Sequence, residues 1–342
     1  MIMTLETKSE RLEILDVLKG IAIIMVVITH CAWTEQQRKQ YYFPFWIDMA
    51  VPIFMLITGY LYSKSFYKRK KILDKKWIER TIIRYTVPFL GVFISECVGY
   101  SFFKYVGIPE AQSFNVKNAV IALIKYGGYG PGSYYYACLL QIVIFFPLIY
   151  WIVNRMKEKG LLICFLVNFS YEIIKTLVCM SPDIYRMIAL RYWFALALGA
   201  YLFVTYQNGR QLSTMFYLGN AGIGLLFLLI SNQYIGNWSP KILNQWTNTS
   251  LIAIMFILPV VGGAIRGKKK IKKLGILNKI GKISYDIFLV QMAYYNFGAN
   301  VILYGVFHNT FIVCLINVLT CIIVGSIYAR FEGMIVNKLQ YN

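Results

Sequence analysis

Apolar segments close to 20 residues long recur along the whole chain. A helix needs about 20 such residues to cross a hydrocarbon core about 30 Å thick. Only 15% of the residues are charged, whereas soluble domains carry about 25%. The sequence therefore predicts an all-α, polytopic integral membrane protein.

Ten of these segments are candidate spans, and no linker, low-complexity tract or fixed-period repeat divides them. We therefore predict one transmembrane domain over residues 1–342 with about ten transmembrane helices. The fifth and eighth segments are short or weakly apolar. The predicted spans are residues 12–33, 45–63, 82–103, 132–154, 160–177, 187–206, 212–231, 249–265, 283–304 and 310–330.

Positive charge is distributed unevenly between the predicted loops. The net charge of +20 would favour a nucleic-acid partner in a soluble protein, but here the basic runs lie between spans, so we predict no nucleic acid. Lys and Arg collect in cytoplasmic loops of membrane proteins. With the N-terminus inside, inner segments hold 24 of them and outer segments 9. Both termini are therefore predicted to be cytoplasmic.

Metal chemistry has little support in the sequence. None of the seven Cys forms a CxxC pair, and the chain has two His. We interpret the cysteines as small buried residues rather than ligands or a disulfide framework. No metal is predicted.

The first span carries an aligned set of ionisable residues. Lys19 and His30 are eleven positions apart, almost three helical turns, so they share one face about 16 Å apart along the axis. Asp16 precedes Lys19 by three and lies on the same face. One interpretation is a structural Asp16–Lys19 pair with an interfacial His. Because ionisable residues in a span are costly and usually face a bundle interior, we favour function.

An imidazole is well suited to remove a proton from an alcohol near neutral pH. His30 near the outer end would act on a substrate arriving from outside or from mid-membrane, while a cation nearer the cytosol would meet an anionic donor. This pattern indicates group transfer across the bilayer.

Four more polar residues lie in or beside the second and third spans. Asp48 would either orient His30 or cap the second span. Arg84 is expected to meet a phosphate or a buried acid, and Arg80 to belong to the basic flank. Glu96 is expected to pair inside the bundle, with direct catalysis as the alternative.

Two further features leave alternatives open. Ser284, Gln291 and Tyr295 form a polar stripe on the ninth span, which helix–helix hydrogen bonding would explain. The stretch 104–131 is the longest predicted outer segment, and its apolar part 116–126 is expected to be an interfacial helix or a lid over a site.

Several segments resemble the prokaryotic acyltransferase 3 family of multi-span membrane O-acyltransferases. LDVLKGIAIIMVVITH is similar to its opening segment, in which a basic residue and a His stand eleven positions apart. VPIFMLITGYLYSKSF and RTIIRYTVPFL resemble its second and third spans. GPGSYYYACLLQIVIFFPLIY, WFALALGAYLF and LNKIGKISYDIFLVQ resemble later ones.

The resemblance implies an acyl-CoA donor, with acetyl-CoA foremost, bound from the cytoplasm. It implies a hydroxyl acceptor on a cell-surface or cell-wall carbohydrate, and a bacterial plasma-membrane location among membrane lipids. It makes His30 the catalytic base, Lys19 its basic partner, and Arg84 and Arg80 donor-binding residues.

The chain departs from the family at some positions: Lys19 stands where Arg is preferred, Tyr135 where Trp is common and Gln291 where His is frequent. We predict Glu96, Tyr135 and Gln291 to bind substrate and Asp48 to support catalysis. The alternative is a transporter or flippase for a glycan or lipid-linked intermediate on the same scaffold. A membrane sensing or anchoring domain is a third reading. The sequence leaves the acceptor and a homo-oligomer open.

Overall fold

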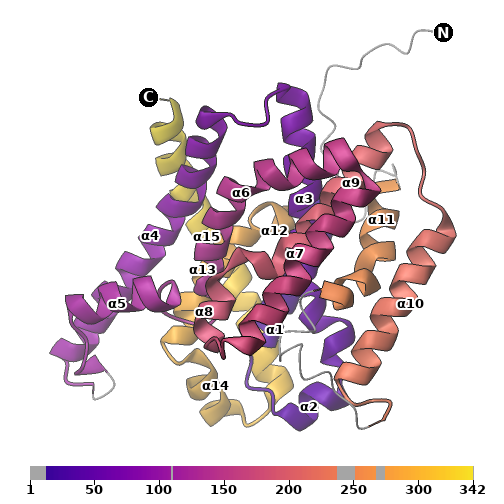
Figure 1. Cartoon of the computed structure of the whole chain (residues 1–342). Coiled ribbons are helices and arrows are strands. Elements are labelled where there is room, and N and C mark those ends of the chain that lie inside the picture. Colours follow the sequence, from indigo (N-terminus) through magenta and orange to yellow (C-terminus); the bar gives the residue numbers. More distant parts are fainter. Residues whose placement is uncertain (1–12, 109–110, 237–250, 267–273, 342) are drawn as a thin grey trace.

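The computed structural model describes residues 13–108, 111–236, 251–266 and 274–341 (Figure 1). All regular secondary structure in these ranges is helical, so the predicted all-α class is confirmed. The elements are α1 Glu13–Thr29, α2 Glu35–Gln40, η1 Phe43–Phe45, η2 Ile47–Met49, α3 Ala50–Arg69, α4 Lys75–Tyr105, α5 Val116–Tyr126, α6 Tyr134–Met156, α7 Glu158–Leu177, α8 Pro182–Met187, η4 Ala189–Tyr192, α9 Trp193–Gln207, α10 Thr214–Ser231, η6 Leu251–Ile257, α11 Leu258–Arg266, α12 Gly275–Lys282, α13 Ser284–Asn296, α14 Ala299–Phe307 and α15 Thr310–Tyr341.

Seven helical segments in the described residues are long and apolar enough to cross a membrane: α3 with its short leading helices, α4, α6, α7, α9 with η4, α10 and α15. The three other predicted spans correspond to shorter or broken elements. The first is α1, of 17 residues, and the eighth is η6 followed by α11. The ninth divides into α13 and α14 at Gly298, which has a positive φ. The count of ten therefore stays a prediction.

Helices differ strongly in how much of their surface the bundle covers. The α9 segment is 89% buried, whereas α10 is 17% buried. A helix that is apolar on all sides and covered on all sides belongs to the centre of a bundle. We conclude that α9 is the central helix and that the exposed apolar face of α10 suits contact with lipid.

α1 and α12 cross at very short range. A Cβ atom built on Gly281 of α12 would lie 1.7 Å from the carbonyl oxygen of Asp16, and one on Gly20 would lie 2.2 Å from that of Leu277. Small residues allow this approach of two backbones in membrane bundles. The crossing holds the start of α1 against the basic end of α12.

The two ends of the bundle carry different elements (Figure 1). The turn between α3 and α4 and the end of α15 lie at one end, whereas α2, α8 and α14 lie at the other. α5 runs across the direction of α4 and exposes Val116, Val120 and Ile124, one turn apart. Residues 116–126 thus form a helix with an apolar outer stripe, as an interfacial helix requires. Of the basic residues counted above, Lys8, Arg11, Lys241 and the lysines of 267–273 lie outside the described residues.

Candidate functional site

A cavity of about 360 Å³ lies among α1, α3, α4, α6, α12 and α13. This volume is within the range of small-molecule sites, about 300–1,000 Å³. Lys19 of α1 and His30, which directly follows α1, both line it. Arg84 of α4 and Tyr135 of α6 line it as well. The structure thus brings together four of the residues singled out in the sequence.

One end of this cavity is cationic. Lys19 lies there with its Nζ 2.7 Å from Oδ1 of Asp16, whose side chain is 5% exposed. Arg84 and Lys282 also line the cavity and are themselves exposed. Exposed lining residues mark a mouth, so this end opens to the surface. Guanidinium and ammonium groups at a mouth attract and bind phosphate.

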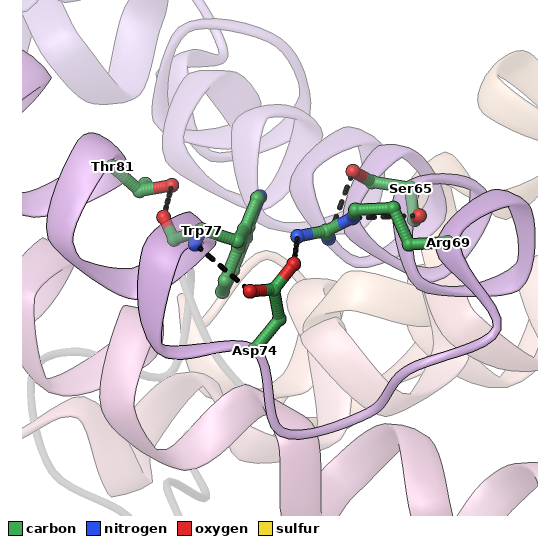
Figure 2. Close-up of polar contacts among 5 residues, drawn as sticks. All are labelled: Ser65, Arg69, Asp74, Trp77 and Thr81. Atoms are coloured by element: carbon green, nitrogen blue, oxygen red, sulfur yellow. Dashed lines mark hydrogen bonds and ion pairs between the residues drawn. The ribbon is translucent and has the colours of Figure 1, made fainter. Parts of the chain in front are cut away.

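The wall at this end is fixed by a polar clamp between α3 and α4 (Figure 2). Asp74 accepts a hydrogen bond from the Trp77 backbone N–H and pairs with Arg69 at 3.2 Å. Arg69 also donates to the carbonyl oxygen and the hydroxyl of Ser65, and its guanidinium lies 4.9 Å from the Trp77 ring centre. Ser65, Trp77 and Thr81 line the cavity. An N-cap shared with an ion pair and a stacked cation orders this wall.

Tyrosines line the middle of the cavity. The hydroxyls of Tyr62 and Tyr85 are 2.9 Å apart, and Tyr285 donates to the carbonyl oxygen of Tyr85 at 2.9 Å. None of these three tyrosines had a site role predicted from the sequence. The sequence gave one indication of a site here, because Lys282 and Tyr285 lie in the segment LNKIGKISYDIFLVQ that resembles the family.

His30 is held at the opposite end by the terminus of α1. The helix ends at Thr29, so the last carbonyl groups of α1 lack partners within the helix. Nitrogen and oxygen donors of four side chains contact carbonyls of this terminus and of the next residue, His30, a set that we term the carbonyl collar. Its donors are Tyr295 to Val27 O at 2.9 Å, Trp33 to Ile28 O at 2.8 Å, Arg38 to Thr29 O at 3.1 Å and Asn300 to His30 O at 2.6 Å.

Two donors of the collar, Asn300 and Arg38, have further polar partners. Asn317, which is fully buried, donates to Asn300 Oδ1 at 2.7 Å and accepts from Tyr294 at 2.9 Å. Arg38 pairs with Asp48 at 3.1 Å. Asp48 therefore reaches the His30 end of α1 through Arg38, and the N-cap of α3 is Met49 rather than Asp48.

Three other predicted site residues lie outside the cavity lining. Arg80 is exposed on α4. Glu96 is 1% exposed and accepts from Asn296 at 2.9 Å. Gln291 is fully buried and donates to the Pro131 carbonyl at 3.1 Å, behind the cavity wall. In the described residues, no group of three or more His, Cys, Asp or Glu side chains is placed to hold a metal ion.

Comparison with family models gives a match over most of the chain. A model described as an acyltransferase domain, the one for the acyltransferase 3 family, matches residues 12–329. Neither the curated proteins nor the solved structures give a match. The matched range contains every residue of the cavity lining.

Proposed function

The chain belongs to the acyltransferase 3 family, and from this premise we propose that it moves an acyl group from cytoplasmic acyl-CoA to a hydroxyl of a cell-surface or cell-wall carbohydrate. The observation that carries the proposal is that His30 and Lys19 line one cavity with Arg84 at its mouth. An acetyl group is the acyl group we favour, and the bacterial plasma membrane is the proposed location.

His30 would act as the general base. It would accept the proton of the acceptor hydroxyl as the hydroxyl oxygen attacks the thioester carbonyl carbon. The C–O ester bond forms, the C–S bond breaks, and His30 returns the proton to the departing sulfur. The collar supports this role, because a base must be held in position relative to the reacting atoms.

Lys19, Arg84 and Lys282 would bind the donor. Acyl-CoA would supply the acyl group as a thioester at the end of a long, slender arm that follows a phosphate-rich nucleotide. The cationic mouth fits the phosphates, and the tyrosine-lined middle fits the arm. Because Lys19 lies about 16 Å along α1 from His30, we assign it to the donor rather than to the reacting carbon.

This assignment needs the cationic mouth to face the cytoplasm. The 24-to-9 bias of basic residues supports that orientation with both termini inside. The turn between α3 and α4, which carries Lys70 and Lys71, lies at the same end of the bundle as the end of α15 (Figure 1).

The test compares surface glycans by mass spectrometry in cells that carry the gene, lack it, or carry His30→Ala. We expect O-acyl groups that depend on the gene and disappear with His30→Ala at equal protein level. His308→Ala is the matched control, because His308 is exposed in the connection between α14 and α15. Unchanged acylation in the His30→Ala cells would refute the base assignment. Glycan export that depends on the gene without any acyl product would instead favour a transporter.

A further inference from the structure

A second hollow, which we term the outer pocket, adjoins the cavity near the end of the bundle that holds α2, α8 and α14 (Figure 1). Its volume is about 420 Å³, and it lies between α5, α8 and the glycine-rich segment 127–133. Gly132 and Tyr134 line both the outer pocket and the cavity of His30. The two hollows therefore adjoin at these residues, and we term segment 130–133, which contains Gly132, the wall.

The wall has a defined shape. Gly130 and Gly132 have φ of +77° and +90°, values that disfavour any residue with a side chain. A Cβ atom on Gly130 would lie 2.4 Å from the carbonyl oxygen of Met292, so the segment packs directly on α13. Gln291 donates to the Pro131 carbonyl at 3.1 Å, and Ser133 donates to the Tyr126 carbonyl at 3.0 Å. These contacts anchor the wall to α13 on one side and to α5 on the other.

The wall region also holds an unused hydrogen-bond acceptor. Gln291 is fully buried, and its Oε1 atom accepts no hydrogen bond from the residues that the structure describes. Buried polar atoms are normally satisfied. The same amide holds the wall through its Nε2 donor, so the open acceptor lies beside the wall.

The outer pocket differs from the cavity in charge. Its charged lining residues are Asp183 and Arg186 of α8, which pair at 3.8 Å with side chains 51% and 33% exposed. A carboxylate beside a guanidinium gives no net charge, so the pocket does not select a phosphate-rich molecule as the cationic mouth does. The pair accepts and donates hydrogen bonds at the same time, which suits a ligand with several neighbouring hydroxyls.

Tyrosines provide the remaining surface of the outer pocket. Tyr126, Tyr129 and Tyr134 line it, and Tyr126 is 43% exposed. A tyrosine ring offers a flat apolar face with a polar hydroxyl at its edge. A sugar ring presents the complementary surface, with C–H groups on its faces and hydroxyls around its rim.

We propose that the outer pocket binds a sugar unit of the acceptor next to the wall that separates it from His30. This inference rests on the proposed function, because it assigns the acceptor side of the same reaction. Tyr126 and the Asp183–Arg186 pair bind the sugar unit and act on affinity for the acceptor rather than on the donor.

The experiment uses the full-length, detergent-solubilised protein with two substrates. The donor is ¹³C-acetyl-CoA, and the acceptor is surface polysaccharide from the cells that carry the gene, stripped of O-acetyl groups by mild alkali. Tyr126→Ala and the shape-conserving Asp183→Asn should each raise the KM for polysaccharide about tenfold and leave the KM for acetyl-CoA unchanged. Tyr105→Ala is the matched control, because Tyr105 is 88% exposed at the end of α4 and outside the pocket lining.

A binding measurement without acetyl-CoA separates the two proposals. Polysaccharide that binds the wild type but not Tyr126→Ala, with no acetyl transfer, would support the outer pocket and contradict the proposed reaction. Acetyl transfer by the wild type with an unchanged KM for polysaccharide in both variants would overturn the outer pocket and leave the reaction standing. An unchanged KM for acetyl-CoA shows that a variant is folded. If Tyr126→Ala does not fold, the KM of the conservative Asp183→Asn for polysaccharide decides whether the outer pocket binds the acceptor.

Discussion

Asn300→Asp is the sharpest test of how His30 is positioned. Asn300 donates its Nδ2 to the His30 carbonyl at 2.6 Å and accepts from Asn317 at its Oδ1. An aspartate has the same shape and keeps the acceptor, but it replaces the donor with a second oxygen. The substitution therefore removes one contact of the carbonyl collar and leaves the contact behind it in place.

The expected size of the effect follows from this single contact. A part-buried carbonyl that loses its donor costs about 1–3 kcal/mol. If the loss falls on the transition state, kcat drops about 5- to 150-fold, because each 1.36 kcal/mol is a factor of ten. The KM for acyl-CoA should stay unchanged, since Lys19, Arg84 and Lys282 lie at the other end of the cavity.

The assay is single-turnover acetyl transfer, normalised to folded protein by size-exclusion chromatography. Asn300→Leu, which adds no charge, should lower kcat at least as far. Asn309→Asp is the control, because the Asn309 Oδ1 accepts from the backbone N–H groups of Phe311 and Ile312, and a carboxylate does the same. Wild-type kcat in Asn300→Asp would refute a positioning role for the collar. If activity falls only in proportion to the amount of folded protein, the collar has a structural role alone.

Three other predictions concern the cationic mouth and the crossing of α1 with α12. Lys19→Met should abolish transfer and lower the unfolding temperature in detergent, because the buried Asp16 loses its Lys19 partner. The double variant with Asp16→Asn should regain the wild-type unfolding temperature but not the activity, and recovered activity would contradict a donor role for Lys19. Arg84→Gln should raise the KM for acyl-CoA about tenfold and leave kcat unchanged. The difference in KM from wild type should shrink at high salt, because exposed charges are screened. A KM difference that does not depend on salt would contradict an electrostatic role for Arg84. Gly281→Val should lower the unfolding temperature, because its Cβ atom would lie 1.7 Å from the carbonyl oxygen of Asp16. The control Gly219→Val should leave the unfolding temperature unchanged, because a Cβ atom there has no neighbour within 4 Å. Equal unfolding temperatures for the two variants would disprove the close crossing.

The sequence was sufficient for the helical class and for the alignment of residues along α1. Periodicity placed His30 and Lys19 on one face, and both line the same cavity. Helix geometry is a local property, so a spacing of eleven positions determines relative direction without any tertiary structure. For 116–126 the sequence left an interfacial helix or a lid as alternatives, and the segment forms the helix α5.

Contacts between segments far apart in the chain could not be predicted from the sequence. Asp48 was expected to orient His30 directly or to cap α3, and instead it pairs with Arg38, whose partner is the Thr29 carbonyl. The stripe on α13 also has divided tasks, since Ser284 lines the cavity, Gln291 holds the wall and Tyr295 joins the collar. A pattern shows which face of a helix is polar, but the neighbour of each position depends on packing that periodicity does not encode.

The wall at 130–133 bears on the choice between an acyltransferase and a transporter. A transporter must pass its whole substrate through the protein, and a wall packed on α13 and α5 opposes that for a bulky glycan. An acyltransferase needs only one acceptor hydroxyl to reach the thioester beside His30, so the bulk of the glycan can stay in the outer pocket. The cationic mouth and the neutral outer pocket add to this difference, because they suit two chemically unlike molecules. A single transported substrate needs the same binding chemistry at both ends of the protein. A donor and an acceptor need different binding chemistry.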